Sequence, residues 1–232
     1  MRPSTDTRLI RCLDGLAMSF AVIDYLHADL HPLCSTLQSS PERLPVAFER
    51  CWSFVDAVHR IREIAQSIPG LSVKTTEVRI FLDATSLAED FRHYIQHLRK
   101  ELMKQPGNNF PVWGSLSWIA PDDPMLNHTV LAGAQIGETT YNGCVFDVVN
   151  RTWVSKVALS VGGRTFNFDL MHEACARFRT FVLPWIGTTY TAGIQVQTQS
   201  PVVSMRLNLT GGDDVPPCND SGSQEPAARL ER

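Results

Sequence analysis

The segment from Arg92 to His97 (RHYIQH) holds one arginine, one glutamine and two histidines within six residues. Residues four apart are neighbours on an α-helix, so Arg92 would lie beside Gln96, and His93 beside His97. Arginine binds phosphate through a planar fork of N–H donors, and histidine exchanges a proton near neutral pH. An arginine and a histidine that face one cleft can therefore catalyse RNA transesterification without a metal ion.

The opposite side of this helix is apolar, as packing against a core requires. Its apolar residues recur at helical spacing: Leu87, Phe91, Tyr94, Ile95, Leu98 and Leu102. On the polar side, Arg99 and Lys100 add positive charge next to the histidines. We therefore expect Gln96, Arg99 and Lys100 to contribute to the binding of a phosphate backbone.

The RHYIQH segment resembles the R-x(4–6)-H motif of HEPN-domain proteins, including the polar residue directly after the arginine. The resemblance implies a helical bundle that forms a homodimer with the motif at the interface. In active members it further implies a metal-independent endoribonuclease with an RNA substrate, paired with an antitoxin or a phage-defence partner protein. By position, Arg92 would stabilise the phosphate, His97 would act as acid or base, and His93 would be an auxiliary catalytic residue.

Other functions remain open for the same face. The same residues could form only the solvated outer face of an amphipathic helix, which is usually charged and polar. The alternative function is a non-catalytic dimerisation or partner-binding module. Glu89, His93 and His97 form a ridge that suits zinc, but no fourth ligand is evident, so we expect no metal and no other cofactor.

Histidines elsewhere in the chain give a weaker signal. His27 and His31 are also four apart, but Pro32 closes that turn, and we expect capping or surface exposure there. Asp147 and Asp169 are too far apart in sequence to be predicted as a pair.

Composition limits the class of protein. The chain has 232 residues, 44% of them hydrophobic, and a net charge of -3, which excludes a largely disordered chain and a protein that is basic overall. Its six cysteines form no CxxC pair, so we expect reduced thiols and a cytoplasmic location. Nothing in the sequence has the pattern of a signal peptide, and the uncharged stretch from Phe181 to Met205 is too polar to span a membrane.

The first part of the chain, residues 1–107, has helical periodicity throughout. We expect a helix from about Asp6 to Leu30, a second from Ser40-Pro41 to Ile68, and a third from Thr76 to Met103 that is broken near Thr85-Ser86. Three long helices with short connections predict an antiparallel bundle.

The second part, residues 108–210, has the pattern of strands. Phe110–Ile119 is aromatic and β-branched, and Gly162-Gly163 predicts a tight hairpin between Trp153–Val161 and Arg164–Phe168. Asn142-Gly143 predicts another hairpin, between residues 130–141 and 144–149. A helix at about 169–183 would cover this small antiparallel sheet, and residues 211–232 would be a disordered tail. The fold class expected is α+β.

Overall fold

The structure is a computed structural model that describes residues 3–103, 112–133 and 142–189. Its helices, in chain order, are α1 (Pro3–Ser35), the 3-10 helix η1 (Pro41–Arg43), α2 (Leu44–Ala65), α3 (Thr76–Ala84), α4 (Ser86–Gln96), α5 (Leu98–Met103) and α6 (Phe168–Thr189). Its strands are β1 (Ser115–Ile119), β2 (Asn127–Leu131), β3 (Phe146–Asp147), β4 (Thr152–Trp153), β5 (Val157–Val161) and β6 (Arg164–Asn167).

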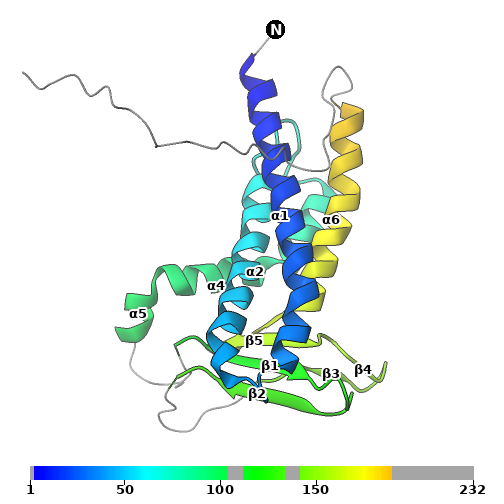
Figure 1. The fold of residues 1–232 in the computed structure, drawn as a ribbon. Coiled ribbons are helices and arrows are strands. Elements are labelled where there is room, and N and C mark those ends of the chain that lie inside the picture. The colour runs from blue at the N-terminus through cyan, green and yellow to red at the C-terminus, as the bar shows by residue number, and fades with distance from the viewer. Residues whose placement is uncertain (1–2, 104–111, 134–141, 190–232) are drawn as a thin grey trace, which may run out of the picture. The chain divides into compact units, whose positions relative to one another are not determined.

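The long helices α1, α2 and α6 pack side by side (Figure 1). Helix α1 buries an apolar residue every seventh position, from Leu9 and Leu16 to Ile23 and Leu30. Seven residues are close to two helical turns, so these side chains form one stripe that faces the core. Within the described residues, no helix is both long and apolar enough to cross a lipid bilayer.

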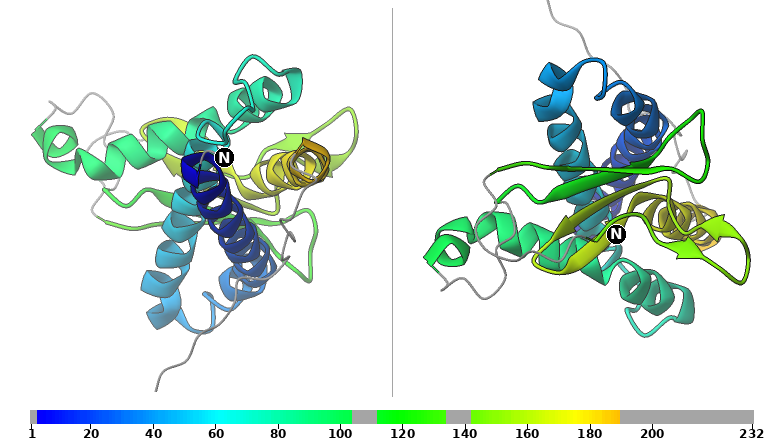
Figure 2. Two further views of the ribbon diagram at one scale, coloured as in Figure 1. Left: turned by 90° about the horizontal axis from the view of Figure 1, so that it is seen from above. Right: turned by 90° about the horizontal axis from the view of Figure 1, so that it is seen from below.

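Four antiparallel strands form a sheet in the order β2-β1-β5-β6, and β3 pairs with β4 in a separate ribbon. Figure 1 shows this sheet at the lower ends of α1, α2 and α6, and the view from below in Figure 2 shows the strands in front of those helices. The Gly162-Gly163 hairpin is confirmed: the two glycines have φ angles of +56° and +79°, which tight hairpin turns require.

The helices and the sheet share one hydrophobic core. The ring of Phe54 on α2 packs edge-to-face with Phe168, with centroids 5.1 Å apart, and with Phe166, with centroids 6.2 Å apart. The ring centroids of Phe91 on α4 and Phe166 are 5.5 Å apart. These contacts confirm the α+β fold, a helical bundle followed by a small antiparallel sheet and one further helix. The change from helix to strand expected at residues 107–108 therefore separates two kinds of secondary structure that pack on a common core.

Some element boundaries differ from those expected. The helix expected at 76–103 breaks at Thr85, as predicted, and also at His97, which was not predicted. The buried Thr85 hydroxyl donates to the Phe81 carbonyl at 2.7 Å, so it competes with the helical backbone at the first break. The helix expected at 169–183 extends to Thr189.

The strand expected at 144–149 is shorter than predicted, and Phe146 pairs with Trp153 of β4. Most of its expected hairpin partner, residues 134–141, lies outside the described residues, as do residues 190–232, which include the tail expected at 211–232.

Candidate functional site

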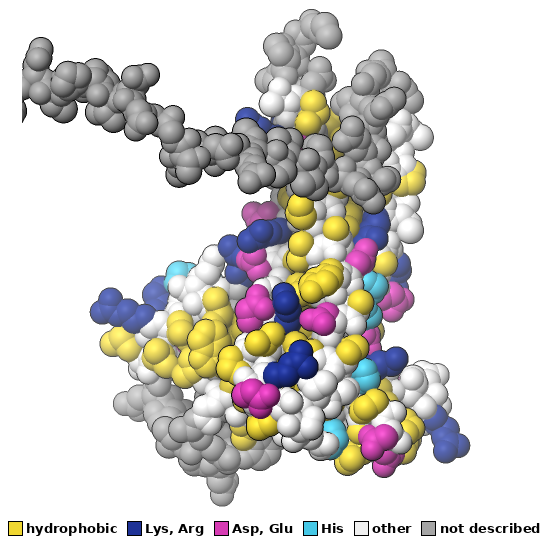
Figure 3. Space-filling model, in the orientation of Figure 1, with side chains coloured by type: hydrophobic (Ala, Val, Ile, Leu, Met, Phe, Trp, Pro, Cys, Tyr) yellow, Lys and Arg dark blue, Asp and Glu magenta, His cyan; other side chains and the backbone are white. Residues whose placement is uncertain are grey.

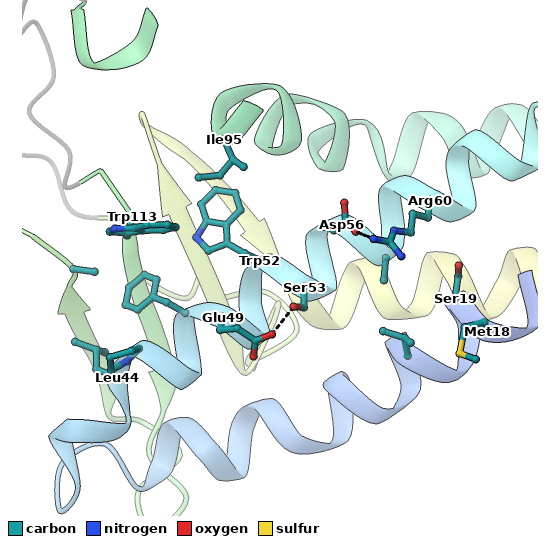
Figure 4. A pocket seen from close by; sticks show the side chains of 15 residues that line it. Met18, Ser19, Leu44, Glu49, Trp52, Ser53, Asp56, Arg60, Ile95 and Trp113 are labelled. Carbon is teal, nitrogen blue, oxygen red and sulfur yellow. Dashed lines mark hydrogen bonds and ion pairs between the residues drawn. The ribbon is translucent and has the colours of Figure 1, made fainter. Parts of the chain in front are cut away.

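Arg92 is directed at helix α2. Its guanidinium forms an ion pair with Asp56, and its Nε donates to the Gln96 side-chain oxygen at 3.1 Å when that amide is turned toward it. Asp56 also binds Arg60 at 2.6 Å (Figure 4). The predicted neighbour relation of Arg92 and Gln96 is thus present, but a carboxylate already balances the charge that was expected to bind phosphate.

His93 and His97 lie together, with ring centroids 4.3 Å apart. His93 is exposed and lines a cavity of about 370 Å³ beside the β5–β6 turn, where Arg164 forms an ion pair with Asp90 at 2.6 Å. His97 is the residue at which α4 ends, with φ of -109° and ψ of 26°. Arg99 and Lys100, the other expected binding residues, are exposed on α5.

The geometry therefore divides the expected site in two. Arg92 pairs with Asp56 of α2 and with Gln96, whereas His93 lines the cavity beside the sheet. Neither Arg92 nor His97 lines this cavity or the groove of about 920 Å³ that includes Ile95 of α4. Glu89, which forms the possible zinc-binding ridge with His93 and His97, accepts a hydrogen bond from Arg62 at 2.9 Å. Across the described residues, no three His, Cys, Asp or Glu side chains form a metal-binding cluster.

An apolar groove of about 920 Å³ lies between α1, α2 and α4, and we call it the α1–α2–α4 groove. Its apolar lining is Met18, Val22, Leu44, Pro45, Phe48, Trp52, Ala57, Ile95, Trp113 and Ala132. Figure 4 shows Trp52, Ile95 and Trp113 at one end and Met18 at the other. Met18 is 54% exposed and Trp113 is 50% exposed, so the apolar lining is open to solvent at both ends of the groove.

Helical spacing explains how the chain builds this groove. Met18 and Val22 are four apart on α1, and Leu44, Phe48 and Trp52 are four apart on α2, so each helix presents an apolar row along the groove. Phe48 also belongs to the core, and Val22, Leu44 and Trp52 pack against it. None of these residues was predicted from the sequence to form a binding surface. One sequence feature could have indicated an exposed apolar surface. Helix α1 carries apolar residues on several sides, and Ile10, Met18 and Tyr25 are all exposed.

Charged groups stand at the edge of the groove and are engaged with each other. Glu49 accepts from the Ser53 hydroxyl at 2.8 Å and lies 3.7 Å from Arg50, and Asp56 is held by Arg60 and Arg92. An apolar floor with a polar edge is the usual composition of a protein-binding surface.

A second cleft, of about 520 Å³, holds side chains that the sequence analysis did not bring together. His27 Nε2 donates to Asp169 at 2.6 Å, and the His27 ring stacks on His172 with centroids 4.0 Å apart. His172 in turn donates to Asp24 at 3.1 Å, and Arg179 binds the same carboxylate at 2.8 Å.

These contacts correct the expectation for His27 and His31, which are half-buried. His31 donates from Nε2 to the Ile119 carbonyl of β1 at 2.8 Å, so it ties α1 to the sheet. Burial alone raises the pKa of Asp24, but hydrogen bonds from Arg179 and His172 outweigh it and lower the pKa. At Asp169 the bonds from His27 and the Lys156 backbone outweigh burial in the same way, so its pKa is also lowered.

Comparison of the chain with models of protein families, with curated proteins and with solved structures gives no significant match. The choice among functions therefore depends on the geometry of the α1–α2–α4 groove and of the α4 histidines.

Proposed function

We propose that this protein is a non-catalytic binding module that holds the apolar face of a partner helix in the α1–α2–α4 groove. The observation that carries the proposal is the groove itself, which has a volume of about 920 Å³, an apolar lining and two tryptophans at one end. Ligand grooves usually measure about 300–1,000 Å³, so this one is large enough for several side chains.

The lining residues have the properties that binding requires. Tryptophan contributes much of the binding energy at protein interfaces, and Trp52 and Trp113 both line the groove. The flexible thioether of Met18 adapts to differently shaped partners. A helix that carries apolar side chains at positions i, i+3, i+4 and i+7 presents a ridge that fits such a groove.

The test uses a synthetic amphipathic peptide with leucines at i, i+3, i+4 and i+7, labelled for fluorescence anisotropy, and a scrambled peptide of the same composition. We expect saturable binding of the patterned peptide alone. Met18→Glu should weaken it by about tenfold or more, because a charge would then lie on the apolar floor. Ile80→Glu, at a 55% exposed residue of α3, is the matched control and should leave binding unchanged. Equal binding of both peptides, or of both variants, would contradict the proposal.

A second candidate, a metal-independent endoribonuclease, is favoured by one observation: the His93 and His97 rings lie 4.3 Å apart, beside the exposed Arg99 and Lys100. Two imidazoles at this distance have the chemistry of an acid and a base for RNA cleavage. Incubation with mixed RNA in EDTA, beside His97→Ala and Arg92→Ala, tests it. Cleavage by the wild type that His97→Ala abolishes would support this candidate. No cleavage, or equal cleavage by all three proteins, would exclude it.

We also propose that the protein works in the cytoplasm. The five cysteines among the described residues are buried free thiols, and persistent free thiols are typical of a reducing compartment. Burial raises the pKa of Cys34, Cys144 and Cys175 to about 12, so these thiols stay protonated and unreactive.

A further inference from the structure

We infer that the second cleft binds the phosphate group of a small phosphate monoester. This cleft contains His27, His31 and His172, and we call it the histidine cleft. It is lined by α1, α6 and the start of β5, and it shares no lining residue with the α1–α2–α4 groove. The inference is therefore independent of the proposed function.

Each of the three histidines uses one ring nitrogen and leaves the other available. Nε2 of His27 and Nε2 of His172 each donate to a carboxylate, and Nε2 of His31 donates to the Ile119 carbonyl. These acceptors carry no hydrogen, so Nε2 holds the proton and Nδ1 has the lone pair when the ring is neutral. Within the described residues, none of the three Nδ1 atoms has a hydrogen-bond partner.

The charges around the histidine cleft favour an anion. Asp169 is the carboxylate in the described lining, and both of its oxygens are engaged, one by His27 and the other by the backbone N–H of Lys156 at 2.7 Å. Asp24, the other carboxylate beside the stacked rings, is balanced by Arg179 at 2.8 Å. The side chain of Lys156 lines the cleft, is exposed and forms no ion pair with a described residue. A ligand therefore meets an ammonium group whose charge is available.

Proton chemistry selects a phosphate monoester among small anions. Its second pKa is about 6, close to the value of about 6.5 for a free imidazole. The shared proton can lie on either partner, so an Nδ1 atom either accepts from a P–OH group or donates to a phosphate oxygen. A carboxylic acid, with a pKa of about 4, has lost its proton near neutral pH and offers only acceptors.

The stacked rings favour a phosphate over a metal ion. The centroids of His27 and His172 are 4.0 Å apart and the two ring planes differ by 6°. Imidazole lone pairs lie in the ring plane, so the lone pairs of two parallel rings do not meet at one ion. A phosphate has several oxygens, and different oxygens can bind the two rings.

The histidine cleft has room for the rest of a small ligand. Its volume of about 520 Å³ lies within the usual range of about 300–1,000 Å³ for small-molecule sites. Leu30, Pro32 and Phe168 give it an apolar wall beside the polar groups. Figure 3 shows histidine side chains on the side of the molecule where α1 and α6 approach the sheet, with acidic and basic side chains near them. Phenyl phosphate, which joins an apolar ring to a phosphate, is the matching probe.

The experiment is isothermal titration calorimetry of the full chain at about pH 6.5, with phenyl phosphate and with phenyl sulfate, which has no proton to share. We expect saturable binding of phenyl phosphate and binding of phenyl sulfate that is about tenfold or more weaker. Lys156→Gln and His172→Phe should each weaken the binding of phenyl phosphate by about tenfold or more, because each removes a charge-assisted hydrogen bond. The phenyl ring of His172→Phe keeps the stack on His27, and circular dichroism checks that both variants fold.

Two control variants separate this site from the rest of the surface. Arg177→Gln removes an exposed cation of α6 that pairs with Glu173 and does not line the cleft, so binding should stay unchanged. Met18→Glu, which disables the α1–α2–α4 groove, should also bind phenyl phosphate like the wild type. Loss of binding in either control would overturn the assignment to the histidine cleft.

The remaining outcomes also decide against the inference. Absence of saturable binding, equal affinity for the sulfate and the phosphate, or full affinity in Lys156→Gln would contradict it. Co-sedimentation with vesicles that contain phosphatidic acid tests the same phosphate chemistry on a lipid. Binding to those vesicles without binding of phenyl phosphate would assign the site to a lipid headgroup instead of a small soluble ligand.

Discussion

At the scale of single residues, Arg62 is a buried charge whose hydrogen bonds join α2 to α3 and α4. Its guanidinium donates to the Leu82 carbonyl, to Thr85 Oγ1 at 2.9 Å and to Glu89 at 2.9 Å, and so joins α2 to the junction of α3 and α4. Thr85 is itself fully buried, so the network lies inside the molecule. Polar groups in such a position are favourable only while all of their hydrogen bonds are made.

We predict that Arg62→Ala lowers the free energy of unfolding by about 2–3 kcal/mol, because the Leu82 carbonyl and Thr85 lose a charged donor. Arg60→Ala is the matched control on the same helix: Arg60 is exposed and pairs with Asp56, and its loss should cost about 0–1 kcal/mol. Urea denaturation of both variants measures the difference. An Arg62→Ala variant as stable as Arg60→Ala would show that the network contributes nothing.

Asp24 and Asp169, which bind the stacked histidines, make the stability of the fold depend on pH. The pKa values of Asp24 and Asp169 are lowered in the folded protein, so their stabilisation is complete above the unfolded pKa of about 4. It is lost as pH falls through the folded pKa. We predict that urea midpoints decline below about pH 4 and that Asp24→Asn makes the decline shallower. The same acid slope in Asp24→Asn and in the wild type would refute this assignment.

At the scale of elements, two glycines should respond in opposite ways to the same substitution. Gly114 precedes β1 with φ of +92°, and an added Cβ would lie 2.5 Å from the Ser160 carbonyl oxygen. Gly187 lies on the exposed side of α6, with nothing within 4 Å of an added Cβ. We predict that Gly114→Ala destabilises by about 1–3 kcal/mol and Gly187→Ala stabilises by about 0.5–1 kcal/mol. Thermal unfolding checks both signs, and destabilisation by Gly187→Ala would be inconsistent with an open helical site.

Local patterns predicted the elements well where local chemistry decides them. Gly162-Gly163 predicted a hairpin because few other pairs adopt two positive φ angles. Thr85-Ser86 predicted a helix break because either side chain could cap a new helix; the break is present, but the Thr85 hydroxyl donates to the Phe81 carbonyl and makes no cap hydrogen bond. The i, i+4 rule likewise predicted the contacts of Arg92 with Gln96 and of His93 with His97.

The site as a whole was harder to predict because its partners are distant in the chain. Asp56, which binds Arg92, is on another helix, and Asp169, which binds His27, is 142 residues away. Residues five apart on an α-helix point about 140° apart, so Arg92 and His97 do not share a face. The α1–α2–α4 groove takes residues from α1, α2, α4 and the strand half, so no single pattern reveals it.

At the scale of the whole molecule, the shared core predicts cooperative unfolding. Phe166 of β6 is fully buried and contacts the rings of Phe54, Phe91 and Phe168, so it links two bundle helices, the sheet and α6. We predict that Phe166→Ala lowers the free energy of unfolding by about 3–5 kcal/mol. Helix content by circular dichroism and tryptophan fluorescence should change at one urea midpoint. Two separate midpoints in the wild type would contradict a common core.

Photo-crosslinking from the groove identifies what binds there. A photoreactive amino acid placed at position 18 lies on the groove floor, and one placed at position 80 lies on the exposed side of α3. We predict crosslinks from position 18 to the patterned amphipathic peptide, mapped by mass spectrometry, and none from position 80. No crosslink from position 18, or equal crosslinking from both positions, would contradict the groove as the binding surface.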